Sequence, residues 1–247
     1  MITNINDFPE IPRSQLPALS TAEMVEVDRL MIESYGIRLI QMMENAGRNL
    51  ADLAQAMLTG EVQDRPLLVL AGRGNNGGGG LVAARHLANR GADVQVVLAR
   101  AMEAFSGTPA HQLDILLTMG VSVTTAGDGW ELPSADLIID ALIGYGLSGA
   151  PRGAAANLIQ LANSHPAAIL SLDAPSGLDT ATGKKYIPCI QAAATMTLAL
   201  PKTGLFAAPE VTGQIFLADI SVPPVLYEDM DIEPGPIFTT SPILRVR

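Results

Sequence analysis

The chain has 247 residues, a formal net charge of −10 at pH 7, and 48% hydrophobic but only 16% charged residues. This length suits one α/β domain with a large core, and the negative charge argues against a nucleic-acid partner, whose phosphates need Lys and Arg. A single cysteine, an amino terminus without a basic segment before an apolar core, and no apolar run near the roughly 20 residues that span a bilayer predict a cytoplasmic protein without a membrane segment.

We expect one domain over residues 1–247, with an extended arm at residues 1–20 and an irregular tail at residues 222–247. Three prolines and weak periodicity predict the arm, which would lie on the body or on a neighbouring subunit. Many proline and acidic residues predict the irregular tail.

Two helices are predicted before the first strand. Ser20 and Glu23 form a capping-box pattern that begins one helix, and Gly36 ends it. The second helix begins near Ile37 and has an apolar face. Its segment 43–47, Met-Glu-Asn-Ala-Gly, contains two polar side chains that either brace a ligand-binding loop or face solvent.

The most informative stretch follows. Residues 67–71 are continuously apolar, residues 72–80 read Gly-Arg-Gly-Asn-Asn-Gly-Gly-Gly-Gly, and residues 81–88 are alanine-rich. This order predicts a buried parallel strand, a tight turn and a helix. Glycines let backbone N–H groups approach an anion, and a helix N-terminus favours negative charge, so we expect a phosphate group here. The turn lacks the GxGxxG form, and no acidic residue ends the next strand, which argues against a hydride-transferring dehydrogenase.

Strands and helices then alternate, which predicts parallel strands with right-handed crossovers. A helix is predicted through residues 111–119. Further strands are predicted at residues 94–98, 121–123, 137–140, 168–173, 194–205 and 213–220.

Two of these strands end in a carboxylate, Asp140 and Asp173. A charged side chain at the end of an apolar strand is costly to bury unless a cation or hydrogen-bond donors receive it. In a doubly wound sheet that end is also where ligands bind. One carboxylate is therefore suited to a cation and the other to proton transfer, although Asp140 as a simple cap of a turn is the alternative.

Taken together, the motifs resemble the NAD(P)HX epimerase family, the YjeF amino-terminal domain that also occurs in apolipoprotein A-I-binding-protein-like proteins. The resemblance runs from about Ser20 to Ile220. Gly79 stands where the family has Asp, and alanines precede Thr195 where the family usually has an acidic residue. The family motifs that match are MENAG at 43–47, GNNGGDG at 74–80, the Asp-x-x-x-Gly strand end at 140–144, DxPSGxD at 173–179, and TVTF…PKxGL at 195–205.

This resemblance implies a Rossmann-like three-layer α/β/α sandwich with a mostly parallel central sheet. It also implies an isomerase that interconverts the R and S epimers of hydrated NADH or NADPH, a bound potassium ion, and a homodimer. The family's potassium ligands fall on Asn76, Asp140 and Ser176. Its substrate contacts fall on Asn75, Asn76, Gly77, Gly78, Gly79, Gly144, Tyr145, Gly146, Leu147, Ser148, Gly149, Ala150 and Asp173.

The chemistry of this substrate suggests a mechanism. Protonation of the hydroxyl beside the ring nitrogen would let the nitrogen lone pair expel water, and water could return to either face of the planar cation. We expect Asp173 to donate and retrieve that proton, and potassium to fix the loops in place. Gly79 leaves an alternative, a catalytically weakened nucleotide-binding or scaffold module, but the presence of both Asp140 and Asp173 favours the enzyme.

Overall fold

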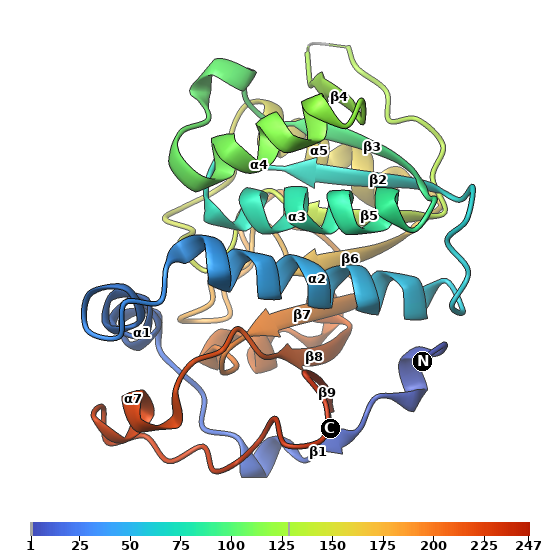
Figure 1. The fold of residues 1–247 in the computed structure, drawn as a ribbon. Helices are drawn as coiled ribbons and strands as arrows, with labels where there is room; N and C mark the ends of the chain where they lie inside the picture. The colour runs from blue at the N-terminus through green and yellow to red at the C-terminus, as the bar shows by residue number, and fades with distance from the viewer. Residues whose placement is uncertain (1, 128) are drawn as a thin grey trace.

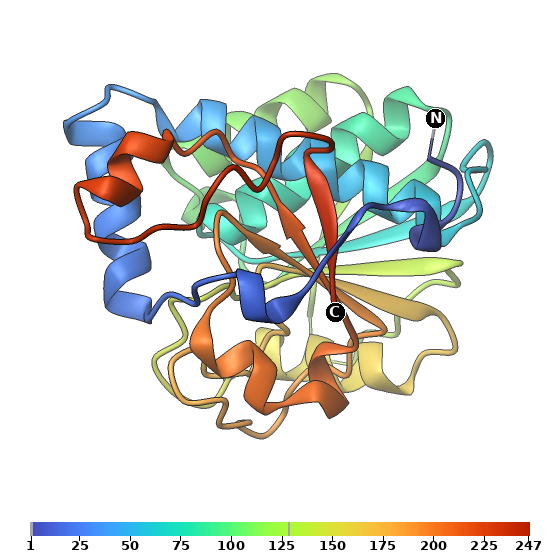
Figure 2. The same ribbon diagram turned by 90° about the horizontal axis from the view of Figure 1, so that it is seen from below.

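In a computed structural model, which describes residues 2–127 and 129–247, a central sheet lies between two layers of helices (Figures 1 and 2). The strands, in chain order, are β1 (Glu10–Ile11), β2 (Pro66–Ala71), β3 (Asp93–Leu98), β4 (Ser122–Thr125), β5 (Leu137–Ala141), β6 (Ala168–Leu172), β7 (Ala194–Leu198), β8 (Gln214–Ala218) and β9 (Ile243–Val246). Their order in the sheet is β1-β9-β8-β7-β6-β5-β2-β3-β4.

Every neighbouring pair from β8 to β4 is parallel, whereas β9 runs antiparallel to β8. The mostly parallel α/β fold predicted from the sequence is therefore confirmed. The helices are α1 (Thr21–Glu33), α2 (Leu39–Met57), α3 (Asn75–Asn89), α4 (Gly107–Thr118), α5 (Ala154–Ser164), α6 (Pro209–Thr212) and α7 (Pro224–Glu228). The four 3-10 turns are η1 (Ile5–Asp7), η2 (Arg13–Gln15), η3 (Met102–Ala104) and η4 (Thr203–Ala207).

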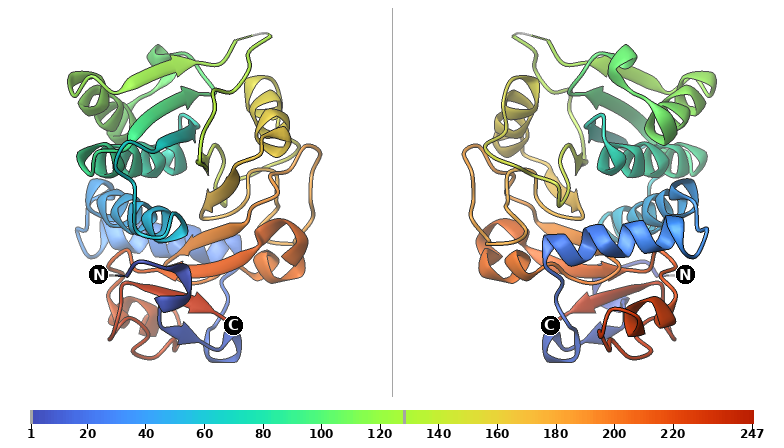
Figure 3. Two further views of the ribbon diagram at one scale, coloured as in Figure 1. Left: turned by 90° about the vertical axis from the view of Figure 1, so that its right-hand side faces the viewer. Right: turned by 90° about the vertical axis from the view of Figure 1, so that its left-hand side faces the viewer.

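The continuous apolar run of β2 is explained by burial on both faces of the sheet. Leu67 and Val69 pack in the core formed with α2, α3 and α4, whereas Leu68 and Leu70 pack on the opposite face with α5. Figure 3 shows these two helical layers on either side of the strands. Because a buried parallel strand needs no polar face, β2 lacks the alternation of a half-exposed strand.

Helix α1 lies beyond the carboxyl ends of the strands, and the arrowheads of β2, β6 and β7 point towards it (Figure 1). Ser20 and Glu23 form both hydrogen bonds of a capping box, which confirms the predicted start of this helix. Met24, Val27 and Met31 form its buried face. The helix therefore places side chains over the sheet edge where ligands bind in α/β folds.

The predicted tight turn at residues 72–80 is wrong in part, since α3 already begins at Asn75 and its glycines are helical. Close packing explains this. A Cβ atom on Gly77 would lie 1.7 Å from the carbonyl oxygen of Gly72, and one on Gly72 would lie 2.0 Å from that of Leu142. The glycines thus let the first turn of α3 pack directly against the ends of β2 and β5.

The prediction of an irregular tail is also wrong in part, because residues 224–228 form α7 and residues 243–246 form β9. The arm lies on the body, where β1 pairs with β9 at the lower end of the sheet (Figure 1). Phe8 of the arm also packs edge-on against Phe216, with ring centroids 5.6 Å apart. The tail becomes a strand because it covers the edge of β8, which would otherwise expose unpaired backbone groups.

None of the helices within the described residues is both long and apolar enough to cross a bilayer.

Candidate active site

A cavity of about 360 Å³ lies at the point where the strand order reverses, between β2 and β5. Ligands of doubly wound folds bind at such a switch point, outside the carboxyl ends of the strands. One wall is apolar and comes from the two amino-terminal helices. The opposite wall is formed by strand ends, the start of α3 and the loop after β5. The apolar wall consists of Met24, Leu39, Met42, Met43 and Ala46.

Seven of the predicted substrate residues line this cavity. They are Asn75, Asn76, Gly79, Gly144, Tyr145, Gly146 and Asp173. Gly77 and Gly78 lie outside the lining, packed against Gly72 and against the side chain of Met43. Leu147, Ser148, Gly149 and Ala150 continue the loop away from the lining, and Ser148 and Ala150 are exposed.

Asp140, at the end of β5, is fully buried and accepts four hydrogen bonds. Its Oδ1 accepts from Ser176 Oγ at 2.6 Å and from the backbone N–H of Leu142 at 3.3 Å. Its Oδ2 accepts from Ser171 Oγ and from the backbone N–H of Ser176, both at 2.8 Å. Burial raises the pKa of this carboxyl above its ordinary value, and these hydrogen bonds oppose the rise. No basic side chain of the described residues forms a salt bridge with it.

The surroundings of Asp140 fit a monovalent cation. Asn76 has a buried Nδ2 atom without a hydrogen-bond partner. Flipping this amide would exchange the two atoms and place the oxygen at the position of Nδ2. Ser176 Oγ, which bonds to Asp140, supplies a further oxygen. The described residues contain no group of three or more His, Cys, Asp and Glu side chains that could hold a metal ion. A single carboxylate with neutral amide and hydroxyl oxygens suits a hard cation of low charge.

Asp173, at the end of β6, differs in that it forms a buried salt bridge. Lys202 Nζ lies 2.5 Å from Asp173 Oδ1, and the two side chains are 0% and 4% exposed. Asp173 Oδ2 accepts from the backbone N–H of Tyr145 at 3.1 Å. Lys202 also donates to the carbonyl of Leu198 at 2.9 Å. Asp173 itself has a left-handed backbone with φ of 67°, a conformation that non-glycine residues rarely adopt and that occurs at functional sites.

Two charged residues of the cavity lining were not among the predicted site residues, Asp28 and Lys202. Asp28 comes from α1 and accepts a hydrogen bond from the hydroxyl of Tyr145 at 2.5 Å. Lys202 lies in the segment that matches PKxGL, and that match was the one available signal for it. Asp28 had no comparable signal, because it reads as an ordinary polar position on an amphipathic helix.

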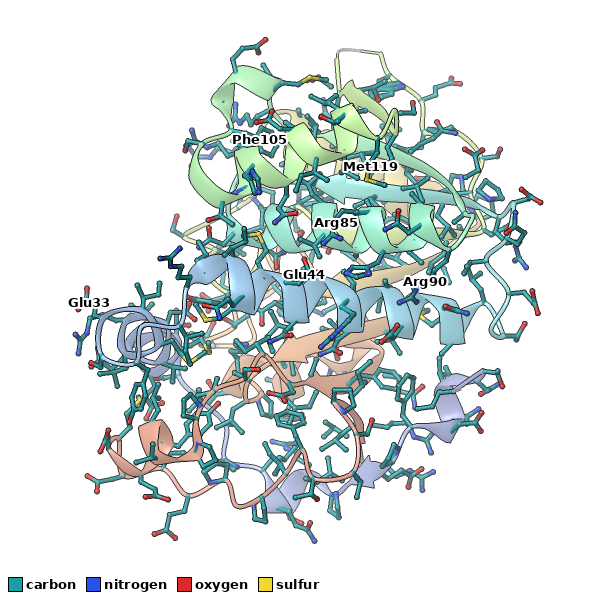
Figure 4. All side chains as sticks on the ribbon, in the orientation of Figure 1. Glu33, Glu44, Arg85, Arg90, Phe105 and Met119 are labelled. Carbon is teal, nitrogen blue, oxygen red and sulfur yellow. The ribbon has the colours of Figure 1, made fainter. Side chains whose placement is uncertain are left out.

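Glu44 braces the site from outside. Its carboxylate accepts from Arg85 and lies 2.8 Å from Nε2 of His86, so it joins α2 to α3. Figure 4 shows Glu44 and Arg85 lying between these two helices. Asn45 bonds instead to Ser221 Oγ at 3.0 Å. Both polar side chains of this motif therefore have structural partners: Glu44 holds α2 against α3, and Asn45 joins α2 to the segment that follows β8.

Gly79 lies in the buried first turns of α3 and faces the cavity lining. A Cβ atom at this position would be 2.8 Å from Cδ2 of Leu172. The space that a side chain would need at this position is thus partly filled by Leu172, which also lines the cavity.

Comparison with known proteins gives a consistent set of relatives. The family model described as YjeF-related protein N-terminus matches residues 39–204. An NAD(P)H-hydrate epimerase of Dehalogenimonas lykanthroporepellens is 45% identical, over 83% of this chain and 82% of its own length. One of Rhodopirellula baltica is 33% identical, over 90% of this chain and 91% of its own length.

Two further matches are a longer bifunctional protein and a solved structure. A bifunctional NAD(P)H-hydrate repair enzyme Nnr of Moorella thermoacetica is 41% identical over 83% of this chain, which spans only 40% of that longer protein. The crystal structure of yeast ynu0 superposes with a TM-score of 0.80 at 26% identity, covering 93% of this chain and 100% of that one.

Proposed function

The chain belongs to the family described as YjeF-related protein N-terminus, and we propose that it is an NAD(P)H-hydrate epimerase, which interconverts the R and S epimers of hydrated NADH and NADPH. Two proteins named NAD(P)H-hydrate epimerase match it over more than four fifths of this chain and of their own lengths. No observation favours the alternative of a weakened binding or scaffold module.

The proposed reaction mechanism rests on the buried salt bridge between Asp173 and Lys202 at the cavity. Loss of water from the hydrated ring leaves a planar cation, and water can attack that cation from either face. A preorganised negative charge at the cavity stabilises such a cation without reorganising during the reaction. We therefore assign Asp173 the role of the catalytic carboxylate, in its salt-bridged form.

The remaining predicted contacts place the rest of the substrate. Asn75 and Asn76 form the first turn of α3, whose N–H groups have no intrahelical acceptors and can receive a phosphate. The methionine-rich wall offers an apolar surface for a ring, and Gly144 and Tyr145 line the same cavity. The protein's net charge of −10 does not oppose this, because the helix end provides local attraction.

Potassium would be held by Asn76, Asp140 and Ser176. A bound ion supplies one positive charge beside a buried carboxylate and joins the start of α3 to the loops after β5 and β6. Those loops also carry Tyr145 and Asp173, so the ion would keep the reacting groups in position.

A direct test starts with purified R epimer of hydrated NADH. The wild-type protein should produce the S epimer far faster than the uncatalysed reaction, as followed by NMR. Binding of the nucleotide without any acceleration would contradict the proposal. The accompanying proposals of a homodimer and of a cytoplasmic location rest on the resemblance and on the single cysteine. Light scattering and cell fractionation test them.

A further inference from the structure

Asp28 lines the cavity from α1, whereas Asp173 follows the end of β6. It is the second carboxyl group in the lining, and it has a different partner. Its Oδ2 accepts the hydroxyl of Tyr145, whose own backbone N–H donates to Asp173. One residue thus touches both carboxyl groups, which places them in the same small polar cluster at one end of the cavity.

The surroundings of Asp28 raise the pKa of its carboxyl group and so favour the protonated form. Burial raises its pKa and is the largest effect, and the charge of Asp173 raises it further. The hydrogen bond from Tyr145 and the charge of Lys202 oppose this, but the net direction is upward. Burial raises the pKa of the Tyr227 hydroxyl in α7, and the charge of Asp28 raises it further, so Tyr227 remains a neutral phenol.

The two carboxyl groups are therefore differentiated by their partners. Asp173 is joined to a buried ammonium group, whereas Asp28 is joined to a neutral hydroxyl. A pair of titratable groups held in unlike environments at one cavity is the usual arrangement for one acid and one anion. The epimerisation needs both, because a proton must reach the departing hydroxyl and a negative charge must stabilise the cation.

We propose that Asp28 is a second catalytic residue, the carboxyl group that gives its proton to the departing hydroxyl while Asp173 remains the anion paired with Lys202. This inference rests on the proposed epimerase function. It also changes the expected role of Asp173, which no longer has to be both proton donor and stabilising charge.

The step balances as follows. The Asp28 carboxyl transfers its proton to the substrate hydroxyl, and the carbon–oxygen bond breaks with both electrons remaining on the oxygen of the released water. The nitrogen lone pair forms the carbon–nitrogen double bond of the planar cation. Water then adds to either face, and its surplus proton returns to the Asp28 carboxylate, which restores the starting acid.

Asp28→Asn tests the proposal, because the amide oxygen still accepts the Tyr145 hydroxyl but the side chain cannot donate a carboxyl proton. We expect kcat to fall by roughly 100-fold or more, the usual contribution of a general acid. The matched control is Asp229→Asn, which alters an aspartate that accepts the hydroxyl of Tyr35 at 2.9 Å outside the cavity. That variant should keep wild-type kcat.

The pH profile gives a second readout. An acid must hold its proton, so wild-type kcat should be high below the raised pKa of Asp28 and should fall as pH rises through it. Asp28→Asn should lack this descending limb. Tyr145→Phe removes the hydrogen bond that lowers the pKa, so it should move the limb to higher pH.

These measurements separate the possible failures. If Asp28 acts only by positioning Tyr145, then Asp28→Asn, whose amide oxygen still accepts the hydroxyl, keeps most of kcat whereas Tyr145→Phe loses it, and that result would overturn the proposal. Wild-type kcat in a folded Asp28→Asn would also overturn it. An inactive wild-type protein would overturn the proposed function as well, whereas an active wild type with an equally active Asp28→Asn would overturn this inference alone.

Discussion

Asp140 and Asp173 end neighbouring strands of the same sheet, and both are buried, yet the chain satisfies them in opposite ways. Asp140 receives only neutral donors, from two serines and from backbone N–H groups. Asp173 receives the ammonium group of Lys202. Within the chain, one of these carboxyl groups therefore has no positively charged partner, whereas the next is paired with an ammonium group.

This difference matters because a buried carboxylate without a counter-charge costs several kcal/mol relative to one in water. Lys202 offsets that cost permanently at Asp173. At Asp140 no basic group of the described residues offsets that cost, so a bound cation would lower it. This supports the proposed role of Asp140 as a potassium ligand. The same sequence pattern, an apolar run that ends in Asp, thus produces a carboxyl group held by neutral donors at one strand and a carboxylate paired with a lysine at the next.

The largest expected effect comes from removing the charge on the reactive side. Asp173→Asn should lower kcat by about 100-fold to 10,000-fold, the range of a general acid–base or charge-stabilising group. Steady-state kinetics with NMR detection of the epimers measures this, and circular dichroism confirms folding. Full activity in a folded variant would remove Asp173 from the mechanism.

The second test breaks the salt bridge from its other end. Lys202→Met leaves Asp173 buried without its partner, so we expect the free energy of unfolding to fall by about 3–5 kcal/mol. Denaturant unfolding measures the loss. The double variant Asp173→Asn with Lys202→Met contains no buried charge at this position and should recover most of the stability but not the activity. A double variant as unstable as the single one would show that the charge pair is not what the fold requires.

The third test concerns the cation side. Exchanging potassium for tetramethylammonium at constant ionic strength should lower the wild-type Tm by about 2–4 °C for each 1 kcal/mol of cation binding. Asp140→Asn should abolish this response. Asp179→Asn is the control, because Asp179 lies in the same motif but accepts the backbone N–H groups of Ala181 and Thr182 instead. An unchanged potassium response in Asp140→Asn would contradict the assignment.

The smallest effect is expected at Gly79, which lines the cavity. Gly79→Asp introduces the family's residue and should raise kcat by up to about tenfold, since one hydrogen bond formed mainly in the transition state contributes roughly 0.5–1.5 kcal/mol. Leu172 crowds the new side chain at 2.8 Å, so Gly79→Asp with Leu172→Val should gain more than Gly79→Asp alone. The Leu172→Val variant serves as the reference. Lower kcat in the double variant than in the wild type would show that the site does not lack this carboxylate.

Much of the fold followed from local patterns. Each predicted strand from residue 67 to residue 220 is present. The central strands β2, β5 and β6 are buried on both faces, and such burial requires the apolar runs that a sequence displays directly. The capping box that begins α1 is equally local, since its two hydrogen bonds join residues three apart. The positions of Asp140 and Asp173 at strand ends were predictable for the same reason.

What the sequence alone determined was therefore the strands β2 to β8, the family resemblance and the two strand-end carboxylates. Only the tertiary structure decided that Asp173 pairs with Lys202, 29 residues away, and that Asp28 bonds to Tyr145, 117 residues away. It also decided that β9 and β1 complete the sheet, and that the glycine segment is helical. The physical reason is that side-chain periodicity reports which face a residue buries, whereas the charge state and partner of a buried polar group depend on which distant side chains the packed chain brings to it.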